Sequence, residues 1–307
     1  DCFAAGLTSV MDAGLHVDEI RLIDSLQKAG HLKMKINAML TPMDSAYLGF
    51  MSEGIYKTER LHVNSVKLYA DGALGSRGAC MIEAYSDDPG NHGLIMYPEA
   101  YYREAIENAL KYNYQVNTHA IGDSGNRFVL DLYSEYLKGR NDRRWRIEHA
   151  QIIHEDDFRK FADFSIIPSI QATHATSDMY WASDRIGDER MKGAYAFKRL
   201  LAQNNWIPNG TDFPIETIYP LHTFYSSVAR KDLSGYPEDG FQMENALSRE
   251  ETLRSMTIWA AKSAFEEKEK GSIEKDKAAD FVVLKQNPLA IDALDLKDIE
   301  IDRTIVN

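Results

Sequence analysis

Two histidines and an aspartate stand at points where short apolar runs of this sequence are expected to end as strands. His119, His149 and Asp212 each close such a run, in three different parts of the chain. Parallel strands bring their carboxyl ends together at one face of a barrel. Imidazole and carboxylate groups are ligands that suit Zn²⁺. The three residues therefore predict a metal site, in which Asp212 would also take the proton from an attacking water.

Each of these residues also has a simpler interpretation. A histidine at a strand end is often a hydrogen-bonded core residue, and Asp212 can cap the segment that follows it. The repetition of the pattern in successive strand–helix units favours the metal site.

Lys67 lies within the otherwise apolar run 63–71. A lysine in a buried strand is unfavourable unless it is paired or modified. One interpretation is an ion pair with Asp71 or Glu148. The other is a metal ligand formed by carbamylation, in which CO₂ turns the amine into a carboxylate. Spacing alone does not separate the two.

Three further residues are candidate substrate contacts. They are Asp71, Arg77 in the run Gly-Ser-Arg-Gly, and His174, which follows the strand after His149. The planar guanidinium of Arg77 can bind a substrate carboxylate through two hydrogen bonds. It can equally pin the glycine-rich loop that contains it.

Length, charge and cysteine count limit the class of protein. A chain of 307 residues can bury a large core. The net charge of -12 argues against a protein that binds nucleic acid phosphates. No apolar run reaches the roughly 18 residues of a membrane span. Cys2 and Cys80 form no disulfide framework, so we expect a reducing, cytoplasmic location.

Strand and helix patterns alternate along most of the chain. We expect barrel-type strands near residues 8, 36, 66, 116, 145, 167 and 207. This alternation predicts an α/β protein with a parallel sheet, and polar residues at strand ends favour a (β/α)8 TIM-type barrel. Seven strands leave the first one missing, so we expect it upstream of Asp1. The absence of a glycine-rich phosphate loop argues against a nucleotide-binding open sheet.

The predicted domains are an incomplete barrel, 1–270, and part of a small β-sandwich, 271–307. One helix is expected over about 249–268, with Ser248 and Glu251 as a capping box. Long loops over 72–98, 175–193 and 215–247 are expected to shape the pocket.

The chain resembles the amidohydrolase superfamily of metal-dependent hydrolases, in particular the branch that includes N-substituted formamide deformylase. The motifs that carry this resemblance occur in the family's order and cover nearly the whole chain. They are Val66–Arg77, Asn117–Asp123, Ile147–Gln151, Gln171–His174 with Ser177–Met179, Gly210–Pro214, Gly271–Ile273 and Ala278–Leu284.

The resemblance implies one or two divalent metals, usually zinc, and a metal-activated water that attacks an amide-type C–N bond outside peptides. It makes His119 and His149 metal ligands and Asp212 both a ligand and the general base. Lys67 takes the place of the family's bridging lysine, which is often carbamylated. The expected partner is a small amide-type substrate, with no nucleic acid and no membrane, and dimers in the family suggest a homodimer.

One departure from the family is its first-strand His-x-His pair, which occurs nowhere in this sequence. We therefore expect a fragment that lacks the N-terminal part of the enzyme and that binds metal weakly or is inactive alone. Two alternatives stay open. One is a metal-independent barrel lyase or isomerase that uses Lys67. The other is a non-catalytic binding protein derived from a barrel.

Overall fold

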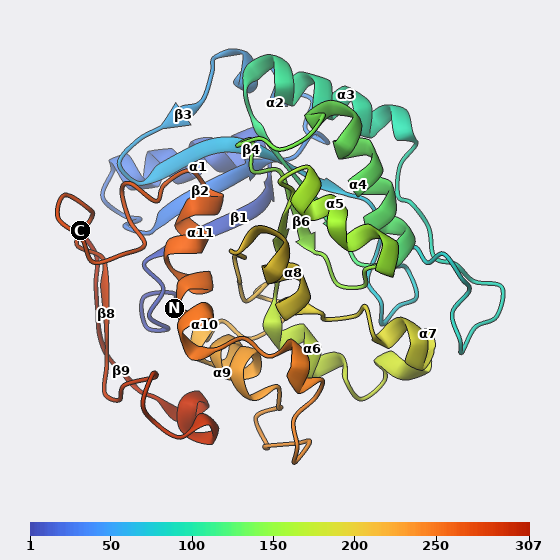
Figure 1. Cartoon of the computed structure of the whole chain (residues 1–307). Coiled ribbons are helices and arrows are strands. Elements are labelled where there is room, and N and C mark those ends of the chain that lie inside the picture. Colours follow the sequence, from blue (N-terminus) through green and yellow to red (C-terminus); the bar gives the residue numbers. More distant parts are fainter.

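The computed structural model describes residues 1–307, and its centre is a curled sheet of parallel strands (Figure 1). The strand order is β1-β2-β4-β5-β6-β7, with every pair on this path parallel. A short strand, β3, pairs antiparallel with β4. The strands are β1 (Ser9–Leu15), β2 (Lys35–Leu40), β3 (Tyr56–Lys57), β4 (Leu61–Tyr69), β5 (Gln115–Ala120), β6 (Arg146–His149) and β7 (Ile167–Ser169).

Helices connect these strands and pack on the outer face of the sheet (Figure 1). The strands in the middle of the sheet are buried along nearly their whole length because helices cover one face and side chains fill the other. The helices are α1 (Val17–Lys28), α2 (Tyr47–Ser52), α3 (Glu99–Tyr112), α4 (Asp123–Leu137), α5 (Phe158–Asp163), α6 (Ala172–Asp178), α7 (Ala182–Met191), α8 (Phe197–Asn204), α9 (Pro220–Ala229), α10 (Arg249–Met256) and α11 (Ile258–Ser263).

The α/β architecture with a parallel, barrel-like sheet is confirmed, and the sheet is a half-barrel with β1 at one edge. The strand expected near residue 207 is reduced to one parallel bridge, between Ile170 and Asn209. Pro208 lacks an N–H group for a ladder, and Gly210 lies two residues later, which explains the short pairing.

Other boundaries also differ from the expectations. The expected loops over 175–193 and 215–247 contain α7 and α9. The helix expected over 249–268 is two short helices, because Thr257 leaves helical geometry at φ −126° and ψ −97°. The capping box of Ser248 and Glu251 is present at the start of α10.

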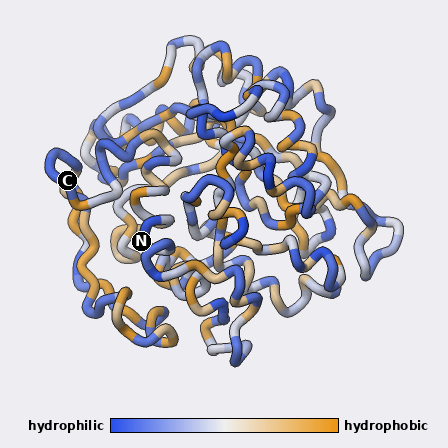
Figure 2. Tube along the Cα trace, in the orientation of Figure 1, coloured by the Kyte–Doolittle hydropathy of each residue, from blue (hydrophilic) through white to orange (hydrophobic).

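The C-terminal segment forms a small antiparallel sheet at the side of the molecule (Figure 1). Its strands are β8 (Phe281–Leu284) and β9 (Ile301–Ile305), and a 3-10 helix, η3 (Ala293–Asp298), packs against α9. The trace of this sheet is largely apolar (Figure 2). Val282 and Ile305 are each 43% exposed. This sheet matches the strands expected after residue 271, while the domain boundary itself stays a prediction.

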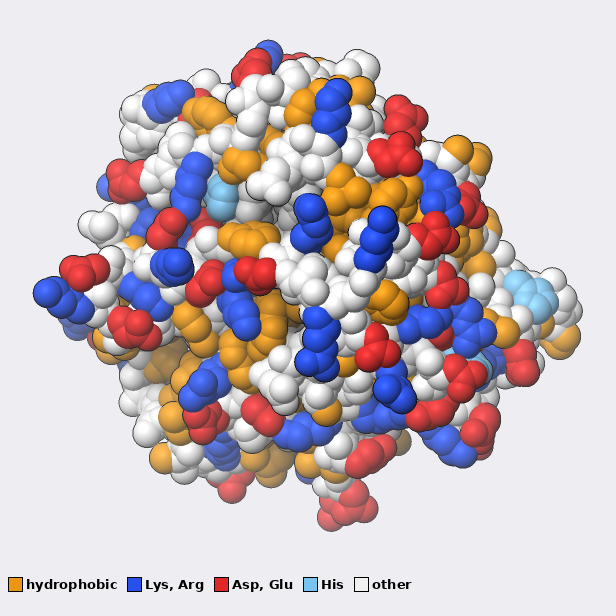
Figure 3. Space-filling view, turned by 45° about the horizontal axis from the view of Figure 1, so that its top comes forward, with side chains coloured by type: hydrophobic (Ala, Val, Ile, Leu, Met, Phe, Trp, Pro, Cys, Tyr) orange, Lys and Arg blue, Asp and Glu red, His pale blue; other side chains and the backbone are white.

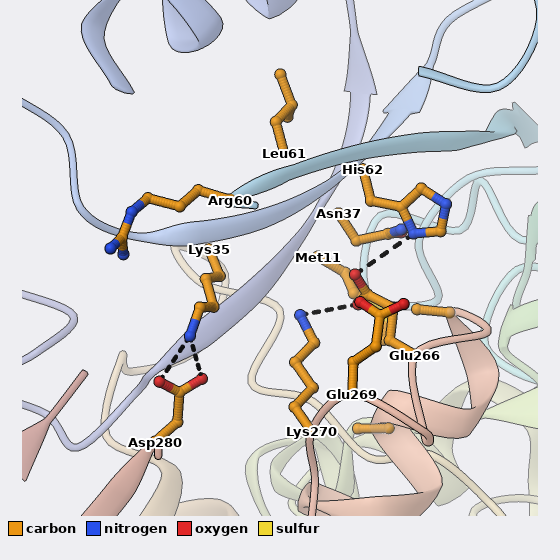
Figure 4. A network of polar contacts seen from close by, with 12 residues as sticks. Met11, Lys35, Asn37, Arg60, Leu61, His62, Glu266, Glu269, Lys270 and Asp280 are labelled. Atoms are coloured by element: carbon orange, nitrogen blue, oxygen red, sulfur yellow. Dashed lines mark hydrogen bonds and ion pairs between the residues drawn. The ribbon is translucent and has the colours of Figure 1, made fainter. Parts of the chain in front are cut away.

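Two groups of charged side chains join the C-terminal half of the chain to the amino-terminal ends of the strands (Figure 4). Lys35 Nζ on β2 lies 2.7 Å from the Asp280 carboxylate, and both side chains are buried. Glu266 contacts His62 on β4 and also pairs with Lys270. These contacts therefore connect the amino-terminal ends of β2 and β4 to residues more than 200 positions away in sequence.

The surface shown in Figure 3 carries acidic and basic side chains interspersed over the whole face, without a broad patch of one sign. None of the helices has both the length and the apolar character that a membrane crossing requires.

Candidate metal centre

Adjacent parallel strands deliver the two predicted histidine ligands to the same end of the sheet. His119 on β5 is in register with Glu148 on β6, and Ala120 is in register with His149. The rings of His119 and His149 meet edge to face, with centroids 4.5 Å apart. The expectation that the sheet brings these two side chains together is therefore correct.

The backbone at two of the site residues lies in the left-handed region, which side-chain-bearing residues rarely adopt. His149 has φ +75° and Asp212 has φ +56°, and Ala150 follows with φ +44°. Such strained residues persist only where the surrounding structure holds them, and they concentrate at functional sites.

Three side chains offer ligand atoms that lie within 4.8 Å of one another: His149, His174 and Asp212. His174 Nε2 lies 3.3 Å from Asp212 Oδ2. The rings of His149 and His174 are stacked, with centroids 5.6 Å apart. His174 belongs to the first turn of α6 rather than to a strand end. The sequence predicted it as a substrate contact, and the structure places it with the candidate ligands.

The donor set fits a divalent metal such as zinc. His149 Nδ1 and His119 Nε2 are buried and make no hydrogen bond, which is unfavourable for a polar atom without a ligand. Burial lowers the pKa of His119 to about 4, and burial also lowers the pKa of His149 well below its usual value. Both rings are therefore neutral near pH 7, which is the form that binds a metal.

His174 is in a different electrostatic environment because it lies between two carboxylates. Its Nδ1 is 3.0 Å from Glu216 Oε1, and its Nε2 faces Asp212. Burial alone would lower the pKa of His174, but the hydrogen bonds to Asp212 and Glu216 outweigh it and raise the pKa to about 9. Sequence reasoning missed Glu216. Its only signal is its place four residues after Asp212 in the same segment.

Lys67 on β4 is buried, and its Nζ lies 4.5 Å from the centre of the Tyr69 ring. Burial lowers the pKa of its amine, while Glu148 and Asp212 act in the opposite direction. Glu148 is itself paired with Arg146 at 2.7 Å. Burial alone would raise the pKa of Glu148, but Arg146 and Lys67 hold it below its usual range.

Asp71 is enclosed by backbone N–H groups. Its carboxylate accepts hydrogen bonds from the N–H groups of Ile121, Gly122 and Cys80, at 2.8 to 3.0 Å. Burial raises its pKa to about 7 in spite of these donors. Its Oδ1 lies 3.5 Å from His119 Nε2. The carboxylate therefore ties the loop after β5 to the end of β4. The Asp71 carboxylate contacts these N–H groups and His119, rather than forming an ion pair with Lys67.

Arg77 is paired with another residue of its own loop. Its Nε and Nη2 donate to the two carboxylate oxygens of Asp87, at 3.0 and 2.8 Å. Asp87 also pairs with Arg185 on α7. In this structure the fork of Arg77 pins the loop, which is one of its two sequence interpretations. Substrate contacts by Asp71 and Arg77 stay predictions.

Comparison with known proteins places these observations in a family. The model of the amidohydrolase family matches residues 1–307. YtcJ of Bacillus subtilis is 33% identical over 243 residues, which are 79% of this chain and 46% of YtcJ. N-substituted formamide deformylase of Arthrobacter pascens is 24% identical over 320 residues, covering 100% of this chain and 57% of that protein.

A crystal structure shows the same fold. An uncharacterized metal-dependent hydrolase from Pyrococcus furiosus superposes with a TM-score of 0.82 and 29% identity, over 93% of this chain and 57% of its own. The chain thus spans about half the length of the relatives that it matches. The resemblance inferred from the motifs is confirmed, and the chain belongs to the amidohydrolase family.

Proposed function

We propose that this chain is the larger part of the catalytic barrel of a metal-dependent hydrolase that cleaves an amide-type C–N bond in a small molecule. The observation that carries the proposal is the convergence of His149, His174 and Asp212, with His119 beside them. The similarity to N-substituted formamide deformylase supports a C–N bond outside peptides as the target.

The donor set of two to three imidazoles and a carboxylate favours zinc among the divalent metals. A divalent cation in this position would activate a water for attack and polarise the carbonyl of the substrate. His119 and His149 supply neutral ring nitrogens. Asp212 has its Oδ2 3.3 Å from His174 Nε2, and its carboxylate would accept the proton from the water.

Lys67 has two roles that this environment supports. Its lowered pKa increases the share of free amine, which can add to the carbon of CO₂ and lose a proton to give a carbamate. A carbamate would provide one more oxygen ligand. The same amine supports the alternative, a metal-independent lyase or isomerase in which Lys67 forms a Schiff base. Borohydride trapping of Lys67 with a carbonyl substrate would favour that alternative.

A cytoplasmic location and a homodimer belong to the proposal as well. The location rests on the small number of cysteines, Cys2 and Cys80, which form no disulfide framework. Proposed partners are limited to the small-molecule substrate and a second copy of the chain.

The decisive experiment is metal analysis of the purified chain by plasma mass spectrometry, with His149→Ala and the exposed His31→Ala as a matched control. We expect about one equivalent of zinc or more in the unaltered chain and in the control, and a loss in His149→Ala. Formamides and other small amides are then screened with and without chelator. A chain that takes up no metal from zinc-containing buffer would contradict the proposed centre.

A further inference from the structure

Glu216 lies at the candidate centre, beside the His174 ring. It follows Asp212 in the connection before α9, so one short segment places a carboxylate at each ring nitrogen of His174. The Glu216 side chain is only 14% exposed. A partly buried carboxylate of this kind contributes to structure or function only through the groups that it contacts.

Two contacts define the place of Glu216. Its Oε1 lies 3.0 Å from His174 Nδ1 and accepts a hydrogen bond of 2.6 Å from Ser177 Oγ. Ser177 is one turn after His174 on α6, and its hydroxyl is also 3.3 Å from the His174 carbonyl oxygen. The carboxylate is thus held against the same helix that carries the imidazole.

Hydrogen bonding at one ring nitrogen determines which nitrogen of a histidine is free to bind a ligand. With Nδ1 engaged by Glu216, the ring cannot turn without losing that bond, and Nε2 is directed at Asp212. We propose that Glu216, supported by Ser177, is a positioning residue that fixes the His174 imidazole with Nε2 facing the candidate centre. The contribution of Glu216 to metal binding rests on the proposed function, whereas the orientation of the His174 ring does not depend on a metal.

The first test determines the orientation of the His174 ring in metal-free protein. In ¹⁵N-histidine-labelled chain, the His174 signals are assigned by their loss in His174→Gln. We expect an Nδ1 proton protected from exchange with water in the unaltered chain and in Glu216→Gln, whose amide oxygen can still accept it. In Glu216→Ala this protection should be lost. An Nδ1 proton equally protected in Glu216→Ala would overturn the proposal.

The second test measures the affinity of the candidate centre for Co²⁺ by calorimetric titration. Loss of a carboxylate behind a ligating histidine is expected to weaken binding by about 10- to 100-fold. We expect that loss in Glu216→Ala, recovery in Glu216→Gln, and no change in Glu238→Gln, which alters an exposed glutamate in the connection between α9 and α10. Unchanged affinity in Glu216→Ala would show that Glu216 does not serve the centre.

The two tests separate the inference from the proposed function. If the unaltered chain binds no Co²⁺, the metal centre fails, and the protection of the His174 proton still decides the role of Glu216. If Glu216→Ala does not fold, as judged by circular dichroism, Ser177→Ala replaces it. Removal of this hydroxyl leaves Glu216 in place, and we expect the same changes at a smaller size.

Discussion

At the scale of single residues, the candidate centre contains histidines in opposite protonation states. His119 and His149 are neutral because burial penalises their charged forms. His174 is equally buried but lies between the carboxylates of Asp212 and Glu216, which favour its charged form. The two neutral rings are ready to bind a metal, whereas His174 must first release a proton.

This difference predicts how stability depends on pH in the metal-free chain. A histidine whose pKa is raised by folding stabilises the fold fully below its unfolded pKa of about 6.5, and this stabilisation is lost as the pH rises through about 9. Relative to His174→Gln, the unaltered chain should therefore lose up to about 3 kcal/mol of unfolding free energy between pH 6.5 and pH 9.5.

Urea unfolding at a series of pH values measures this difference, with His31→Gln at an exposed position as the control. The control should follow the unaltered chain at every pH. A His174→Gln variant whose stability runs parallel to that of the unaltered chain would contradict the raised pKa.

At the scale of secondary structure, the start of α4 depends on its contact with Asp71. Gly125 lies in the first turn of α4, and a Cβ built there would be 2.4 Å from Asp71 Oδ2. The N–H groups of Ile121 and Gly122, just before the helix, donate to the same carboxylate. The end of β5, which carries His119, is therefore held by a close approach that only glycine allows.

We predict that Gly125→Ala destabilises the fold by roughly 1 to 3 kcal/mol, because the added methyl group must displace a buried carboxylate. Gly49 is the matched control, since it lies within α2 and a Cβ there meets no atom within 4 Å. Gly49→Ala should raise the unfolding free energy by up to about 1 kcal/mol, because alanine favours the helix. Thermal and urea unfolding compare the two, and equal effects would argue against the close packing at Asp71.

At the scale of the whole molecule, β1 is an edge strand of the sheet. Residues from the C-terminal half of the chain contact the amino-terminal ends of β2 and β4 (Figure 4). The link between Lys35 and Asp280 spans 245 positions in sequence, and the two side chains are 7% and 5% exposed. Ion pairs this deeply buried behave differently from the many exposed pairs on the surface. Removal of one partner leaves the other charge without compensation.

We predict that Asp280→Asn costs about 3 to 5 kcal/mol of unfolding free energy. The exposed pair of Lys285 and Glu300, at 53% and 69% exposure, is the internal comparison. Glu300→Gln should cost about 0 to 1 kcal/mol, because water screens the interaction. Urea denaturation of both variants gives the two values. A small effect for Asp280→Asn would show that water reaches Lys35 once the partner is gone.

The sequence by itself determined the features that repeat along the chain. Alternating strand and helix patterns predicted the parallel sheet, and polar residues at the ends of apolar runs predicted that His119 and His149 meet. Both follow from local rules, since a parallel strand delivers the residue at its end to one face of the sheet whatever lies around it. The sequence predicts a loop over 215–247, whereas Pro220–Ala229 of that range forms α9.

Only the tertiary structure decided the features that depend on contacts between distant segments. The pairing of Glu216 with His174 joins residues 42 positions apart, and the buried Lys35–Asp280 pair joins two ends of the chain. The left-handed backbone at Asp212 and the single bridge at Asn209 replaced an expected strand. Packing sets these geometries, because side chains and strained dihedral angles take the arrangement that their neighbours enforce, and no local pattern records those neighbours.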